Sequence, residues 1–133
     1  MKPAGLDASK GLVTTQFLKQ PGDPAWANDD EVKAYKEFLK KYAPSANPDD
    51  YSVLVAYMNV HAVALVLKKC GDQLTRENLI RQATALHGER LPMMLPGISI
   101  STRPDDYVAF KTLRIAVFDG NSWTLADEPI TAD

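Results

Sequence analysis

The longest apolar run of the chain, Tyr51 to Gly71, is the centre of the predicted fold. The carboxylates of Asp49-Asp50 stand before it, where they can cap a helix and interact with the positive end of its dipole. Lys68-Lys69 and Gly71 close the run with the cations and the flexible residue that are typical of a helix C-terminus. The pattern therefore predicts a helix of about 20 residues, roughly 30 Å long.

Two interpretations of this helix differ in what surrounds it. About 30 Å is also the thickness of the hydrocarbon core of a bilayer, so one interpretation is a membrane span. However, Asn59 and His61 lie in the middle of the run, and each costs free energy in lipid unless it is paired. We favour a central helix that is buried on most sides in a water-soluble domain. Such a helix needs partners on several faces, and a chain of 133 residues is short to supply them all.

Two further helices are predicted from apolar residues that recur at spacings of three and four. The first begins at an N-cap on Asn28 or Asp29, runs to about Tyr42 and is ended by Pro44. The second begins at an N-cap on Thr75 and ends before Gly88. Their inward faces are Val32, Tyr35, Phe38, Leu39 and Tyr42 in the first helix, and Leu79, Ile80, Ala83 and Leu86 in the second.

Strands are predicted near both ends of the chain from β-branched or alternating runs. The prolines of the segment 91–97, LPMMLPG, exclude a helix interior or a central strand there. The result is an α/β chain of one compact domain, with three helices and strands at both ends. The expected strands are Leu12 to Leu18, Ile98 to Thr102, Thr112 to Phe118 and, after a turn at 119–122, Trp123 to Ala126.

Composition narrows the classes of function. The net charge of −2 and the isoelectric point near 5.6 give no electrostatic footprint for nucleic acid or for an anionic membrane surface. The only cysteine, Cys70, excludes an internal disulfide and a zinc site built from cysteines. The first residues, MKPAGLDASKG, lack an apolar core, so no signal peptide is expected in this chain.

No set of residues suited to catalysis emerges, and we do not expect an enzyme. His61 is interpreted as a hydrogen-bonded core residue rather than a base or a ligand, and His87 as a cation in the last turn of its helix. Asp105-Asp106 is interpreted as a turn and cap, with a cation site as the alternative. Cys70 is interpreted as a small buried apolar group. No metal site, phosphate-binding loop or cofactor motif is expected.

Tyr57, on the central helix, is the candidate ligand-binding residue. An aromatic ring that ends in a hydroxyl suits the wall of a ligand cleft. The alternative is a core tyrosine whose hydroxyl is satisfied by the protein. The residues alone leave both interpretations open.

Several stretches, in the same order and spacing, together resemble the C-terminal portion of the branched-chain amino acid binding proteins. These are the periplasmic substrate-binding subunits of ABC importers, and they have the type I periplasmic-binding-protein fold. The resemblance covers almost the whole chain. It is carried by Ala4-Gly5, Lys10 to Leu12, Lys19 to Trp26, Gly71 to Leu79, Leu91 to Ile98, Thr102 to Tyr107 and Phe118 to Trp123.

The resemblance implies that residues 1–133 are the last third of a two-lobed protein, which traps its ligand when the lobes close about a hinge. Residues 11–18 and 112–118 would be two of the strands that cross the hinge. The helices that start near Asn28 and Tyr51 would cover the sheet of one lobe. That sheet would lie in sequence absent from this chain, which agrees with a central helix short of partners.

For function, the resemblance implies a periplasmic solute-binding component that binds an amino acid-like or aromatic acid ligand and catalyses no reaction. The full-length protein would deliver this ligand to an ABC transporter permease. Of the residues that touch ligand in the family, Tyr57 is the one that falls in this chain, so the chain is not expected to bind alone. Two alternatives remain: a ligand-binding sensor domain of a signalling protein, and a module that forms a homodimer through exposed apolar surface.

Overall fold

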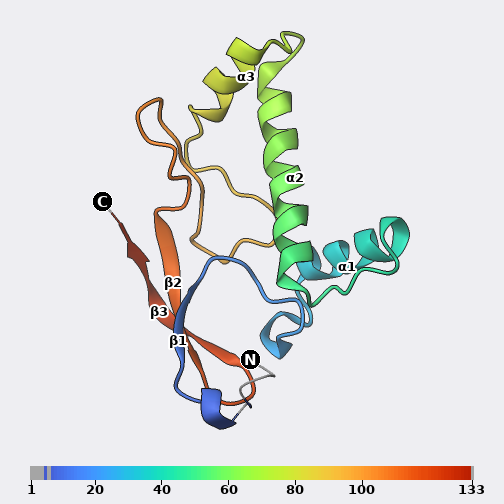
Figure 1. The fold of residues 1–133 in the computed structure, drawn as a ribbon, viewed down its shortest axis with the longest axis vertical. Helices are drawn as coiled ribbons and strands as arrows, with labels where there is room; N and C mark the ends of the chain where they lie inside the picture. The colour runs from blue at the N-terminus through green and yellow to red at the C-terminus, as the bar shows by residue number, and fades with distance from the viewer. Residues whose placement is uncertain (1–4, 6, 133) are drawn as a thin grey trace.

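The structure is a computed structural model that describes residue 5 and residues 7–132 (Figure 1). A three-stranded sheet lies on one side, and one long helix stands on the other side, with the irregular segment 84–111 between them. Two shorter helices lie at the two ends of the long one. The elements in chain order are a 3-10 turn at Asp7–Ser9, β1 (Val13–Gln16), a 3-10 turn at Pro24–Trp26, α1 (Asp30–Tyr42), α2 (Tyr51–Cys70), α3 (Arg76–Ala83), β2 (Thr112–Phe118) and β3 (Trp123–Thr131).

The sheet is antiparallel throughout, with β2 in the middle. β1 is shorter than the predicted run 12–18 because the chain after Gln16 leaves β2 and pairs with the segment 91–97 instead. There the Phe17 carbonyl accepts from the Leu95 N–H, and the Lys19 N–H donates to the Met93 carbonyl. The prediction of β2 is confirmed residue for residue.

β3 extends to Thr131, so the prediction that it ends at Ala126 is wrong. Pro129 is tolerated because β3 is an edge strand, whose outward N–H groups need no partner. The register shifts between Arg114 and Ala116, and the Arg114 guanidinium donates to the Ala126 carbonyl there. The predicted strand at 98–102 is also absent, because Ile100 forms only isolated bridges.

α1 begins where its cap predicts, since the Asp29 carboxylate accepts from the Glu31 and Val32 N–H groups. Val32, Tyr35 and Leu39 are buried, as predicted for the inward face. Phe38 and Tyr42, which the spacing also placed inward, are exposed. They lie at the margin of the stripe, and the described residues supply no cover for that side.

α3 ends at Ala83, well before the predicted boundary at Gly88. The Thr84 hydroxyl donates to the Ile80 carbonyl, and the chain then turns away. The Leu86 N–H donates to the Thr102 hydroxyl, so a tertiary contact replaces the next helical turn. His87 therefore lies outside the helix, and the prediction that it serves as a helix C-terminal cation is wrong.

α2 spans the predicted run, with the Asp50 carboxylate accepting from the Ser52 N–H and Gly71 following its last residue. Only one stripe of it is buried, at Leu54, Met58, Val66 and Cys70. The prediction that this helix is buried on most sides is therefore wrong for the described part of the chain, where Val60 is 66% and Val63 58% exposed. By length and mean hydropathy (1.5), α2 would suffice to cross a bilayer, and 22% of its apolar window is buried.

The core lies between the buried stripe of α2, the inner face of α1 and the proline-containing segment 91–97. The segment is irregular but well packed, which is why its prolines do not conflict with burial. Met93 has a positive φ of 69°. The fully or almost fully buried residues of this core include Leu18, Val32, Tyr35, Leu54, Met93, Met94, Leu95 and Ile98.

Gly71 occupies a backbone conformation (φ 56°, ψ −137°) that side chains with a Cβ rarely adopt. We expect Gly71→Ala to lower the free energy of unfolding by about 1–2 kcal/mol, through backbone strain at the end of α2. Urea unfolding followed by circular dichroism measures this change, with Asp72→Ala as the neighbouring control. Equal stability of the two variants would contradict the assigned role of Gly71.

Candidate functional site

Tyr57 lies in an apolar groove of about 370 Å³ between α1 and α2. The groove exists because the α1 face that carries Phe38 and the α2 face that carries Val60 both lack cover. Its volume suits a small apolar or aromatic group. The lining residues are Phe38, Leu39, Val53, Ala56, Tyr57, Val60, His61 and Ala64.

Three aromatic rings surround the Tyr57 ring edge to face. Their centroids lie 5.0 Å away for Tyr35, 5.2 Å for Phe38 and 4.5 Å for His61. Burial, and secondarily the negative charge of Glu31, raise the pKa of the Tyr57 hydroxyl, so it stays protonated at neutral pH. Tyr57 thus packs as a half-buried core tyrosine and also forms one wall of the groove.

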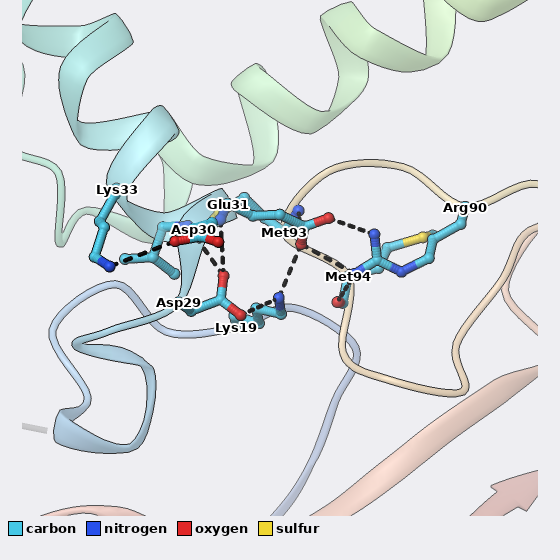
Figure 2. A network of polar contacts seen from close by, with 9 residues as sticks. Lys19, Asp29, Asp30, Glu31, Lys33, Arg90, Met93 and Met94 are labelled. Carbon is cyan, nitrogen blue, oxygen red and sulfur yellow. Dashed lines mark hydrogen bonds and ion pairs between the residues drawn. The ribbon is translucent and has the colours of Figure 1, made fainter.

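A cluster of ion pairs that no sequence motif predicted lies at the start of α1 (Figure 2). The Lys19 ammonium, with only 5% of its side chain exposed, lies 2.6 Å from the Asp29 carboxylate and 2.9 Å from that of Glu31. Arg90 holds Glu31 from the other side with both guanidinium NH₂ groups and also donates to the Met94 carbonyl. The cluster ties the start of α1 to the segment after β1, through Lys19, and to the segment that precedes residues 91–97, through Arg90.

Glu31 is the centre of this cluster. Its carboxylate also accepts from the Met93 N–H at 3.3 Å. Hydrogen bonding from Arg90, opposed by burial and supported by Lys19, lowers the pKa of Glu31 to about 2. The pKa of Asp29 is lowered as well: burial raises it, but the hydrogen bond from Lys19 and the backbone N–H groups that Asp29 caps outweigh this.

A second, more polar cleft of about 330 Å³ lies between the loop after β1 and the tip of the β2–β3 hairpin. Its lining combines carboxylates, an amide pair and two aromatic rings, those of Phe118 and Trp123, whose centroids are 5.2 Å apart. No local motif predicts this cleft, because three distant segments form it. They contribute Gln20, Gly22, Asp23, Pro24, Asp49, Phe118, Asn121, Ser122 and Trp123.

The other residues singled out from the sequence, Asp106, His61 and Cys70, make contacts within the protein. The Asp106 carboxylate accepts from the Val108 N–H and pairs with Lys111, in keeping with a turn and cap. His61 lies against the Tyr57 ring, and Cys70 is buried and free. Within the described residues, no three histidine, cysteine or acidic side chains gather in a way that could hold a metal ion.

A solved structure of a branched chain amino acid ABC transporter protein from Thermus thermophilus, with bound valine, has a similar fold. The two superpose with a TM-score of 0.66 at 18% sequence identity, over 95% of this chain and 35% of that one. No family model and no curated protein matches the chain. The likeness confirms the predicted fold class: three helices and a three-stranded sheet match a part of a periplasmic-binding-protein fold, and the chain spans about a third of its neighbour's length.

Proposed function

We propose that this chain is part of the solute-binding component of an ABC importer, which holds an amino acid-like or aromatic acid ligand between two lobes. The observation that carries the proposal is the superposition over 95% of the chain on a transporter protein with bound valine. Binding by lobe closure needs no acid, base or nucleophile. The compartment is then the periplasm, and the partner is a membrane permease.

Residues 11–18 and 112–118 are proposed as two hinge crossings. β1 and β2 are neighbouring antiparallel strands, with Val13 opposite Val117 and Gln16 opposite Arg114. Two adjacent strands joined by backbone hydrogen bonds form a bendable but continuous connection. The polar cleft lies beside them and would open or close as they bend.

The uncovered face of α2 supports the view that the complete binding protein contains more than this chain. A 20-residue helix with 22% of its apolar window buried requires further cover in water. In the proposed protein, the sheet of the same lobe supplies it. The 133 residues alone would then bind ligand weakly or not at all.

Isothermal titration of the full gene product with valine, leucine, phenylalanine and benzoate tests the proposal. We expect micromolar affinity for at least one of them, and no measurable heat with residues 1–133 alone. Absence of binding by the full product to every amino acid and aromatic acid tried would refute the proposal.

Tyr57 is proposed as the residue of this chain that contacts the ligand. Replacing Tyr57 with alanine would remove an aromatic wall, and we expect ligand affinity to fall about 10- to 100-fold. Asn59→Ala, an exposed position on the same helix, is the matched control and should leave affinity unchanged. If Tyr57→Ala binds as well as the native protein, the residue is a core tyrosine only.

A further inference from the structure

The polar cleft between the loop after β1 and the tip of the β2–β3 hairpin is a cavity that the proposed ligand site does not use. It shares no lining residue with the groove at Tyr57, and none of its lining residues belongs to α2. Its volume of about 330 Å³ is enough for a compact organic molecule. The side chains that line it define which molecule fits.

The charged groups that line the cleft are carboxylates. Asp23 and Asp49 line it, whereas no lysine or arginine among the described residues does. The Asp49 carboxylate lies directly against the loop, because a Cβ added at Gly22 would be 3.0 Å from its Oδ1. Neither carboxylate forms an ion pair with a described residue. Two carboxylates in one cleft repel each other, and a bound cation relieves this repulsion.

Two aromatic rings in the lining favour an organic cation over a metal ion. Phe118 is buried and Trp123 half-buried, and both line the cleft. An aromatic ring attracts an ammonium group through its negative face and also packs against an apolar body. A hard metal ion such as calcium needs six or more oxygen ligands, and within the described residues no three acidic, histidine or cysteine side chains gather to hold a metal.

We propose that this cleft binds a primary ammonium compound of about the size of benzylamine. The nitrogen lies at the carboxylates of Asp23 and Asp49, and the apolar body packs on Trp123. An ammonium group has three N–H donors, which suit two carboxylates and an amide oxygen such as that of Gln20. A carboxylate on the ligand would be repelled, so amino acids and aromatic acids do not fit. The inference is therefore independent of the proposed function, whose ligand belongs at Tyr57.

Isothermal titration of the full gene product with benzylamine tests the site. We expect a Kd of about 0.1–1 mM, the range open to a ligand with so few atoms. Benzyl alcohol, which has nearly the same shape without the charge, should bind at least about 10-fold more weakly, and benzylamine should bind equally well when benzoate is present. No binding of benzylamine, or equal affinity for benzyl alcohol, overturns the inference. Displacement of benzylamine by calcium chloride at a lower concentration than that of the amine also overturns it, because the cleft would then be a metal site.

Two variants of nearly unchanged shape locate the site. Asp23→Asn and Asp49→Asn each remove one negative charge, and asparagine in place of Asp23 can still accept the Ala25 N–H that caps the turn. We expect each variant to weaken benzylamine binding about 10-fold. Asp72→Asn, which removes a charge at an exposed position after α2, is the matched control and should keep the native affinity. Native affinity in either cleft variant, or an equal loss in Asp72→Asn, overturns the inference.

Discussion

Tyr35→Ala is expected to lower the free energy of unfolding by about 4 kcal/mol, the largest effect of any single change considered for this chain. Tyr35 is fully buried, and its ring packs edge to face on Tyr57 at 5.0 Å. Its hydroxyl donates to the Pro48 carbonyl at 3.2 Å, which ties α1 to the turn that leads into α2. Truncation removes both contacts and leaves a cavity. Because small domains are stable by only about 5–15 kcal/mol, this loss removes a large part of the total stability.

Two further variants separate the contributions of Tyr35. Tyr35→Phe keeps the ring and loses one hydrogen bond, so we expect a loss of about 1 kcal/mol. Tyr42→Ala, on the same helix but 64% exposed, should cost less than about 1 kcal/mol. Urea unfolding followed by circular dichroism measures all three. A cost for Tyr42→Ala equal to that for Tyr35→Ala would contradict the burial described here.

Glu31→Gln is expected to lower the free energy of unfolding by about 2 kcal/mol at pH 7 and to change its dependence on pH. The pKa of Glu31 is lowered from 4.5 to about 2, chiefly by the hydrogen bond from Arg90. A shift of that size corresponds to roughly 3 kcal/mol, and screening on the exposed side of Arg90 reduces it. Because the folded pKa is depressed, this stabilisation is present above about pH 4.5 and is lost as pH falls towards 2.

Unfolding midpoints in urea at intervals between pH 7 and pH 2 measure this contribution. The native chain should lose stability steadily below about pH 4.5, and the difference from Glu31→Gln should shrink over the same interval. Glu37→Gln, an exposed position on the same helix, is the control and should follow the native curve. A constant difference between native chain and Glu31→Gln at every pH would show that the ion cluster does not act through the charge of Glu31.

The sequence predicted those elements whose ends carry local signals. Asp29 and Asp50 are caps that act on N–H groups two or three residues away, so the starts of α1 and α2 could be placed from the sequence. The end of α3 could not, since it depends on Thr102, 16 residues beyond Leu86 in the chain. The pattern at 98–102 alternates like a strand, but no neighbouring segment offers Ile100 more than single bridges.

The candidate site was predictable only in part, for the same reason. Tyr57 could be singled out because its ring chemistry and its place on an apolar helix are properties of one residue. The ion cluster joins Glu31 to Arg90, 59 residues apart, and the polar cleft joins three separate segments. No local motif marks the residues of either one, and only the folded chain brings them together.

The edges of the sheet bear on how copies of this chain can meet. β1 offers an edge only four residues long, and β3 carries Pro129, which has no N–H, directly after the charged pair Asp127-Glu128. Short edges, charges and proline all discourage the addition of a foreign strand. Growth into fibres by strand stacking is therefore disfavoured at both borders of the sheet.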